Sequence, residues 1–254
     1  MNNVLADDQI VAIRECGKIL SFAMKEVKKA VAPGVSTHQL DEIAHKSILD
    51  KGGEPSFLNY EVSGIGYYPA SLCVSINEEI VHGIPSKDRI LKDGDIVSLD
   101  LGAKYKGVCT DMAVTLPVGE ISEIAQKLIE VTKECLDRGI SAAIAGNKIG
   151  AIGESVQKHA ESNGFGVVRD LVGHGIGTKP HMAPNIPNYG KKTAGPKILE
   201  RMALAIEPMI TVGDYNIEPK SDGWTISTTD KSLAAHFEHT IVIVEGIAEI
   251  ITAG

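Results

Sequence analysis

Four acidic residues lie in segments that read as β-strands, where alternate side chains point to opposite faces. Each acid therefore shares its face with the residues two positions away: Asp100 with Ser98 and Gly102, Asp111 with Cys109, Ala113 and Thr115, Glu207 with Ala203 and Ala205, and Glu238 with Thr240 and Val242. A water-facing strand usually adds Lys, Arg, Glu or Gln on the same face, yet apart from His236 these faces carry small or uncharged residues. The pattern favours acids that line a cavity over acids on a solvated sheet, and their convergence in the fold decides between the two.

Carboxylates that face one enclosed space repel one another unless cations neutralise them, so convergence implies bound metal. His174 stands between glycines in the stretch Val172 to Gly177, which leaves its imidazole room to act as a fifth ligand, although such a histidine is equally typical of a turn. Oxygen ligands with one imidazole favour Co, Mn, Fe or Zn. Two divalent ions would balance four carboxylates, and metal binding lowers the pKa of water from about 15.7 to about 7. These residue types predict a hydrolytic metal centre.

Four amphipathic helices are predicted from apolar residues that recur every three or four positions. Their core-facing residues are Ile10, Ile13, Leu20, Met24 and Val27 in the first helix, Leu40, Ile43, Ala44 and Ile48 in the second, Ile121, Ile124, Leu128, Val131 and Cys135 in the third, and Ile149, Ile152, Val156 and Ala160 in the fourth. Ser36 with Gln39 three positions later matches the capping box of the second helix. Each pair of helices precedes a group of strands.

Short apolar runs broken by Gly, Pro and Asp predict those strands. Ile96 to Leu101 and Val108 to Leu116 are predicted to form a hairpin that turns between Ala103 and Gly107, and later strands are predicted at Leu204 to Ile206 and Thr240 to Val244. No flexible linker separates the repeats. We therefore predict a single α+β domain over residues 1–254, with two similar halves at approximately 7–117 and 120–250 and a curved sheet covered by helices.

Composition excludes several function classes. The net charge of −8 argues against a nucleic-acid partner. Met1 to Asp8 lack the basic head and apolar core of a leader peptide, and no apolar run is long enough for a membrane span. Cys16, Cys73, Cys109 and Cys135 show no C-x-x-C pairing, which favours a reducing cytoplasm over a disulfide framework.

Six spaced stretches form a recognisable set: His82 to Pro85, Ser98 to Gly102, Thr110-Asp111, Gly173 to Gly177, Ile206 to Pro208 and Phe237 to Thr240. This set resembles the motifs of the type I methionine aminopeptidases of the M24 metallopeptidase family, in their short bacterial form. The resemblance spans nearly the whole chain. It implies the pita-bread fold, with two pseudo-symmetric halves and a curved antiparallel sheet. It also implies metal-dependent hydrolysis that removes the first methionine of new polypeptides when the next residue is small.

The resemblance also implies roles for individual residues. The metal ligands would be Asp100, Asp111, His174, Glu207 and Glu238, with Asp111 and Glu238 bridging two ions. Glu207 would also act as general base, held in an extended backbone by Pro208. His82 would lie near the substrate amine, and His181 would polarise the scissile carbonyl.

The methionine pocket implied by the resemblance contains Tyr68, Cys73 and Trp224, an aromatic wall and a thiol that suit a thioether. From residue type alone, such a Trp and Cys are more typical of a core, and His82 is more typical of a loop histidine that caps backbone. Three sites depart from the family pattern. Pro180 replaces a common aromatic residue, Met182-Ala183-Pro184 stands where acids are common, and His236 stands where Gln is usual, pointing toward the metals.

Two rival functions remain open at this point. An Xaa-Pro aminopeptidase or prolidase shares the ligands, but usually carries an extra N-terminal domain, whereas only 53 residues precede Glu54-Pro55 here. A non-catalytic binding module on the same fold would have lost ligands, and all five are present. The expected partner is the N-terminal peptide of nascent polypeptides near the ribosome. The expected enzyme is a cytoplasmic monomer that binds neither nucleic acid nor membrane.

Overall fold

The computed structural model describes residues 4–253, so residues 1–3 and 254 at the ends of the predicted domain lie outside it. Its helices are α1 (Asp7–Ala30), α2 (Thr37–Asp50), α3 (Glu123–Ala142) and α4 (Gly150–Ser162). The strands of its large sheet are β1 (Glu54–Pro55), β4 (Leu72–Ile76), β6 (Ile96–Tyr105), β7 (Val108–Pro117), β9 (Gly173–Gly175), β10 (Met182–Ile186), β11 (Ala203–Ile206), β16 (Glu238–Val244) and β17 (Ile247–Ile250).

The large sheet runs in the order β1-β6-β7-β16-β11-β9-β10, with β4 also paired to β6 and β17 to β16. All of its pairings are antiparallel. The smaller sheets are β2 (Glu61–Val62) with β3 (Gly66–Tyr67), β13 (Ile217–Pro219) with β14 (Ile226–Thr228) and β5 (Glu79–Val81), and β15 (Ala234–His236) with β12 (Met209–Thr211) and β8 (Gly166–Val167). The predicted α+β class with an antiparallel sheet is confirmed.

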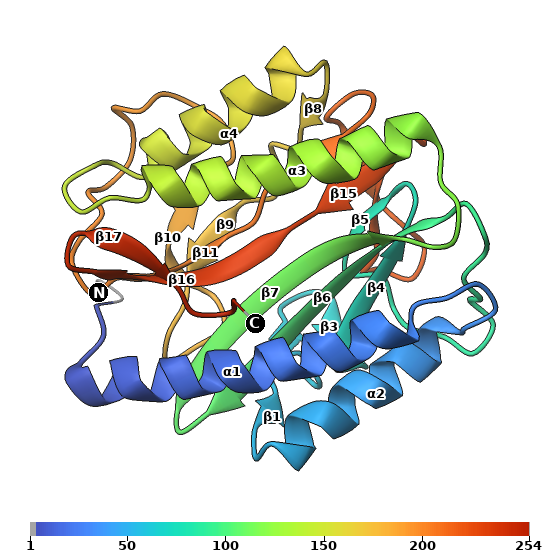
Figure 1. The fold of residues 1–254 in the computed structure, drawn as a ribbon, viewed down its shortest axis with the longest axis horizontal. Coiled ribbons are helices and arrows are strands. Elements are labelled where there is room, and N and C mark those ends of the chain that lie inside the picture. Colours follow the sequence, from blue (N-terminus) through green and yellow to red (C-terminus); the bar gives the residue numbers. More distant parts are fainter. Residues whose placement is uncertain (1–3, 254) are drawn as a thin grey trace.

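The helices cover one face of this sheet in two pairs, with α1 and α2 along one part of it and α3 and α4 along the other (Figure 1). Leu99 and Leu101 of β6 share a buried cluster with Leu20 of α1. Ile241 of β16 shares a second cluster with Leu128 of α3. Full burial of each such side chain stabilises the fold by roughly 1.5–3 kcal/mol. Because side chains alternate along a strand, this apolar packing directs Asp100, which lies between Leu99 and Leu101, to the opposite face.

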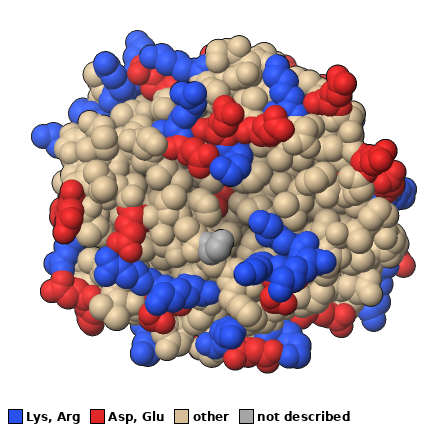
Figure 2. All heavy atoms as spheres, in the orientation of Figure 1, with Lys and Arg blue, Asp and Glu red and all other residues tan. Residues whose placement is uncertain are grey.

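The outer surface of the helices is a solvated face. Lys and Arg side chains are interspersed with Asp and Glu over the face seen in Figure 2. Ion pairs one helical turn apart, such as Lys18 with Glu15 and Lys133 with Asp137, contribute to this mixture. Within residues 4–253, no helix combines the length and the apolar character needed to cross a bilayer.

Two local predictions need correction. The hairpin turns at Lys106-Gly107 alone, because the paired strands extend to Tyr105 and Val108 and both turn residues have the positive φ that a two-residue turn requires (47° and 80°). The third helix begins at Glu123, since the Ser122 side chain accepts a hydrogen bond from Ala125 N as the N-cap. Ile121 therefore precedes the helix, and Ile124 is 43% exposed rather than core-facing.

The predicted capping box at the start of α2 is confirmed. Ser36 Oγ accepts a hydrogen bond from Gln39 N (3.3 Å), and Gln39 Oε1 accepts one from Ser36 N (2.9 Å). These two bonds satisfy backbone donors that the first helical turn leaves free.

Replacing Ser36 by alanine tests the strength of this cap. Ser36→Ala should lower the free energy of unfolding by about 1 kcal/mol, because Gln39 N loses its acceptor. Urea denaturation measures the change, and Ser63→Ala at an exposed position is the control, expected to stay within about 0.5 kcal/mol of the parent. Equal stability of the two variants would contradict the assigned cap.

Candidate active site and metal centre

Strand register brings three of the four acids together on the face of the sheet away from the helices. Asp100 of β6 and Glu238 of β16 both lie opposite Ala113 of β7, on its two sides. Asp111 lies two residues before Ala113 in the same strand and so points to the same face. All three acids are buried, with 8%, 2% and 3% of Asp100, Glu238 and Asp111 exposed. The alternative of solvated acids on a wet sheet is therefore wrong.

The remaining two predicted ligands enter from β11 and β9. Ala205 of β11 pairs with Thr240 of β16 on one side and with His174 of β9 on the other, and Glu207 follows two residues later. His174 thus lies in a short strand and not in the turn that its flanking glycines also allowed. Gly173 is needed for this approach, since a Cβ there would lie 2.5 Å from Ala205 O.

The side chains that could hold metal form three overlapping groups. In each group the ligand atoms lie within 4.8 Å of one another: Asp100, Asp111 and Glu238; His174, Glu207 and Glu238; and Asp111, His174 and His181. The five predicted ligands therefore lie together, with His181 beside them. The imidazoles of His174 and His181 are adjacent, with ring centroids 4.4 Å apart.

Several oxygen and nitrogen atoms of these residues have no hydrogen-bond partner in the described part of the chain and are available to bind divalent cations. Buried oxygens of Asp100 (Oδ1), Asp111 (Oδ1) and Glu238 (Oε1) have no hydrogen-bond partner among the described residues. His174 Nδ1 lies 3.0 Å from Gly175 O, which leaves Nε2 free, 3.4 Å from Glu207 Oε1. A buried acceptor with neither donor nor cation is costly, whereas carboxylate oxygens and an imidazole nitrogen are ordinary ligands of divalent metals.

The same burial changes the acidity of the site. Removal from water raises the pKa of Asp100 to about 7 and that of Glu207 to about 8, because a buried carboxylate is less stable than the neutral acid. The pKa values of Asp111 and Glu238 lie well above the usual range for the same reason and because neighbouring acids repel. The histidine beside them shifts the other way, since burial lowers the pKa of His174 to about 3. Without metal, burial therefore favours the protonated form of these acids and the neutral form of the imidazole.

Backbone hydrogen bonds that sequence reasoning missed fix two of the acids. Thr240 Oγ1 accepts from Asp111 N and donates to Asp111 O, both at 2.8 Å, and thereby joins β16 to β7. Asn188 Nδ2 donates to Glu207 O at 2.9 Å. Thr240 was visible in the sequence as a residue in phase with Glu238, whereas no local signal pointed to Asn188.

His236 lies at the edge of this cluster, as its strand phase predicted. Its backbone N and O are both hydrogen-bonded to Thr115 Oγ1. The side chain is fully buried, and neither ring nitrogen has a hydrogen-bond partner within residues 4–253. Nε2 lies 3.6 Å from Glu207 Oε2, which is beyond direct hydrogen-bond distance. Burial lowers its pKa, so the imidazole is a neutral neighbour of Glu207.

A cavity of about 320 Å³ adjoins the acids and contains every predicted pocket residue. Its lining includes Tyr68, Cys73, Trp224, His82 and His181, together with Phe57, Tyr60, Val62, Val81, Leu171, Val172 and Met209. Cys73 of β4 pairs directly with Asp100 of β6, which places the pocket beside the acids. Tyr68 packs edge-on against Trp224, with centroids 5.2 Å apart.

The two auxiliary histidines reach this cavity from different elements. His82 follows β5 with a left-handed backbone (φ 60°), and burial lowers its pKa to about 4. His181 lies before β10 at an exposed rim, with Nδ1 2.9 Å from the Tyr60 hydroxyl. Pro180 and Met182 flank it there, so the departures from the family pattern around His181 lie on the rim, whereas His236 is buried beside Glu207. Tyr60 was missed because its segment shows neither helical nor strand periodicity.

The comparisons with known proteins agree with this geometry. Residues 11–245 match metallopeptidase family M24. The chain is 48% identical over 246 residues to a methionine aminopeptidase of Clostridium acetobutylicum, covering 97% of this chain and 96% of that protein. The chain belongs to metallopeptidase family M24. Its fold superposes on a crystal structure of methionine aminopeptidase from Thermotoga maritima with a TM-score of 0.95, at 41% identity and full coverage of both chains. The predicted family resemblance and pita-bread fold are confirmed.

A less similar solved structure shares the fold but has a different named activity. Prolidase from Pyrococcus furiosus matches with a TM-score of 0.76 at 21% identity, covering all of this chain and 66% of that chain. This likeness shows a shared fold alone. Membership of a metallopeptidase family carries dependence on divalent metal, for which the clustered acids and His174 are the candidate site.

The raised pKa values predict that the metal-free protein loses stability as the pH rises from 7 to 8. Over this window the folded chain holds protons on carboxyl groups such as Glu207, with a pKa of about 8, that the unfolded chain has already released. Because the folded state binds more protons, the free energy of unfolding falls by up to about 1.4 kcal/mol per pH unit for each such group. Urea denaturation of the chelated protein at both pH values measures the fall.

The metal-loaded protein is the control for this measurement, because bound divalent ions displace those protons and should flatten the pH dependence. Burial also raises cysteine pKa values, to about 11 for Cys16, but that contribution is common to both forms. If the free energy of unfolding of the chelated protein stayed constant or increased from pH 7 to 8, the raised pKa values assigned to the buried acids would be contradicted.

Proposed function

We propose that the chain is a methionine aminopeptidase, a hydrolase that uses two divalent metal ions to remove the first methionine from polypeptides whose next residue is small. The observation that carries the proposal is one cavity of about 320 Å³ in which buried carboxylates without partners adjoin an apolar pocket. Exopeptidase chemistry needs that combination, since the centre cleaves the bond and the pocket selects the terminal side chain.

The overlap of the ligand groups supports two ions rather than one. Glu238 belongs both to the group with Asp100 and to the group with His174 and Glu207, and Asp111 belongs to the first group and also to one with His174. A carboxylate that belongs to two groups could serve both ions. In the proposal Asp100, Asp111 and Glu238 would hold one ion, and His174 and Glu207 would complete the site of the other. Co, Mn, Fe and Zn all suit these donors.

When bound, the ions polarise the scissile carbonyl and make water acidic enough to ionise near neutral pH. In the proposal Glu207 is the general base that takes the proton from the attacking water and passes it to the leaving amine. Its backbone oxygen is held by Asn188 Nδ2 at 2.9 Å, which limits movement of the carboxylate during the transfer. His236 adjoins Oε2 of this carboxylate and would orient it through a small approach or a bridging water.

The two auxiliary histidines would bind opposite parts of the substrate. If the Tyr60 hydroxyl donates to His181 Nδ1 across the 2.9 Å between them, the ring proton lies on Nε2. That proton can then be donated to the carbonyl oxygen as negative charge develops on it. His82, neutral because burial lowers its pKa to about 4, would accept from the substrate amine or the scissile N–H.

The apolar part of the cavity would receive the methionine side chain. Tyr68, Trp224 and Cys73 form one cluster with Phe57, and sulfur–aromatic contacts favour a thioether there. An Xaa-Pro peptidase on the same fold remains the rival. The proposal also places a single-domain monomer in the cytoplasm, acting on nascent chains near the ribosome without nucleic acid or membrane.

Two tripeptides separate the proposed function from its rival. The metal-loaded protein should release methionine from Met-Ala-Ser and leave Ala-Pro-Ala intact, and chelation should abolish release until Mn, Co or Fe is restored. Liquid chromatography of the products measures both reactions. Cleavage of Ala-Pro-Ala alone would transfer the assignment to the Xaa-Pro peptidases.

Glu207→Gln tests the general base. This change keeps the size of the side chain and one oxygen but removes the proton acceptor, so kcat should fall by about 10²–10⁴-fold with the circular dichroism spectrum unchanged. Glu218→Gln in the distant β13 is the matched control and should keep full activity. Metal binding by each variant is measured by calorimetry, and a metal-loaded Glu207→Gln enzyme with undiminished kcat would refute the role.

A further inference from the structure

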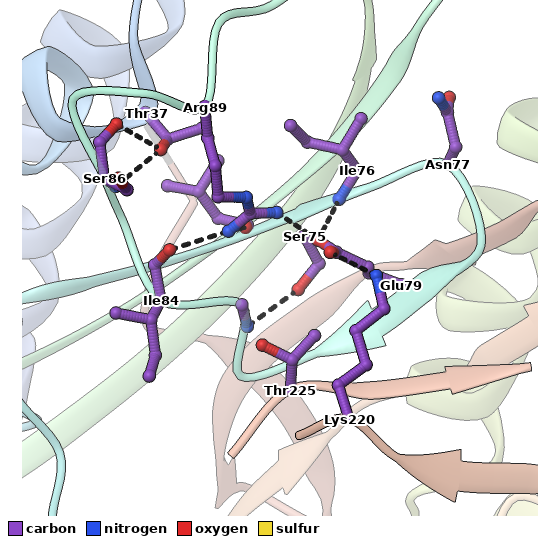
Figure 3. Close-up of polar contacts among 12 residues, drawn as sticks. Thr37, Ser75, Ile76, Asn77, Glu79, Ile84, Ser86, Arg89, Lys220 and Thr225 are labelled. Atoms are coloured by element: carbon purple, nitrogen blue, oxygen red, sulfur yellow. Dashed lines mark hydrogen bonds and ion pairs between the residues drawn. The ribbon is translucent and has the colours of Figure 1, made fainter. Parts of the chain in front are cut away.

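A buried carboxylate outside the metal centre holds two cations from different parts of the chain. Only 7% of Glu79 is exposed. Its Oε2 accepts from Ile76 N at 2.9 Å and from the Arg89 guanidinium, and its Oε1 accepts from Lys220 Nζ at 2.8 Å (Figure 3). Although partial burial disfavours its charge, the bonds to Glu79 and Glu78 hold the pKa of Lys220 above the ordinary value. Every oxygen of the Glu79 carboxylate therefore has a charged partner.

Arg89 links this carboxylate to the turn that carries His82. Its Nη1 donates to Ile84 O at 2.7 Å (Figure 3). The same nitrogen donates to Val74 O at 3.2 Å. The turn is packed closely against β4, since a Cβ on Gly83 would lie 2.1 Å from Val74 O and Gly83 O accepts from Val74 N at 2.8 Å. The guanidinium therefore holds both sides of the junction from which His82 enters the cavity.

Lys220 links the same carboxylate to the turn that carries Trp224. This turn joins β13 to β14, and Lys220 N donates to Thr225 O at 2.8 Å across it. Within the turn, Asp222 Oδ1 accepts from Trp224 N at 2.9 Å and from Thr225 N at 2.8 Å. The indole then packs against the Tyr68 ring in the wall of the cavity.

Pairing of β14 with β5, in which Ser227 lies opposite Glu79, brings the two turns to opposite sides of this carboxylate. We propose that Glu79, through Arg89 and Lys220, is a positioning residue that sets the spacing between His82 and Trp224 and thereby the fit of the N-terminal side chain. This inference rests on the proposed function, because it takes the N-terminal side chain of the substrate to be methionine. None of the three network residues lines the cavity or belongs to the ligand groups, so their effect is on substrate fit and not on metal binding.

Glu79→Gln tests the proposal, with Glu78→Gln as the matched control. Glu78 Oε1 also lies 3.5 Å from Lys220 Nζ, but the Glu78 side chain is about one-third exposed. Among the described residues, Glu78 makes no ion pair with Arg89. Glu79→Gln should raise KM for Met-Ala-Ser about tenfold with kcat within about threefold of the parent, the signature of lost substrate binding. Metal affinity by calorimetry should be unchanged. The control should match the parent in all three quantities.

The single tryptophan of the chain gives a readout that does not depend on activity. In Glu79→Gln and in Lys220→Met, Trp224 emission should shift to longer wavelength and acrylamide quenching should increase, because the turn is released from the carboxylate. Lys220→Arg, which preserves the ion pair, should restore the parent spectrum. Arg89→Met should raise KM but shift the emission less than Lys220→Met does, since the hydrogen bonds of the Arg89 side chain run to Glu79, Val74 and Ile84 and, among the described residues, not to the turn of Trp224.

Unchanged KM and unchanged emission in Glu79→Gln would overturn the proposal. A lower melting temperature with parent emission and parent KM would also overturn it, because it would leave Glu79 a purely structural role. If Glu79→Gln fails to fold, Lys220→Met and Lys220→Arg decide the question through the emission alone. Failure of the parent to release methionine would sink the proposed function but would leave the emission test of positioning valid.

Discussion

Mutual repulsion among four adjacent carboxylates, three of them buried, is the constraint around which this structure is organised. Each acid alone could be accommodated by protonation, and burial does raise the pKa values of Asp100 and Glu207 to about 7 and about 8. Together they form a space in which buried oxygens have no donor among the described residues. Such a site destabilises the metal-free fold, because its carboxylates repel one another and these oxygens lack hydrogen-bond donors within residues 4–253. Binding of divalent cations relieves both effects, and this relief contributes to the affinity for metal.

The rest of the fold holds those acids in place against that repulsion. Apolar residues of the same strands, such as Leu99 in β6 and Ile241 in β16, are buried under the helices on the opposite face. A shift in register by one residue would expose this core and bury charge in its place, so the packing fixes the phase of the acids. Thr240 adds a direct restraint, since its hydroxyl joins both backbone groups of Asp111 to β16.

The same residue type serves two purposes in this molecule, distinguished by partners. The carboxylate of Glu79 is fully paired with Arg89, Lys220 and a backbone N–H. The acids of the metal centre are left with unpaired oxygens. A satisfied buried carboxylate makes a rigid joint between segments, whereas an unsatisfied one is a ligand. Buried carboxylates that are fully paired thus hold the pocket walls in place, whereas buried carboxylates with unpaired oxygens are available to bind metal.

The sequence by itself determined the local features. The period of the apolar residues predicted the helices, Ser36 and Gln39 predicted a cap, and strand phase separated each acid from its apolar neighbours. These features depend on residues a few positions apart, which is why they can be read locally. The spaced motifs also carried the resemblance to the family, in which His236 and Pro180 stood out as departures.

Only the tertiary structure decided which of these residues meet. Convergence of the acids depends on the register of β6, β7 and β16, and the placement of His174 depends on its pairing with Ala205 across β9 and β11. The contacts of Tyr60 with His181 and of Lys220 with Glu79 join residues 121 and 141 positions apart. Local periodicity carries no record of such pairs, because they are selected by packing of the whole sheet and not by the conformational preference of either segment.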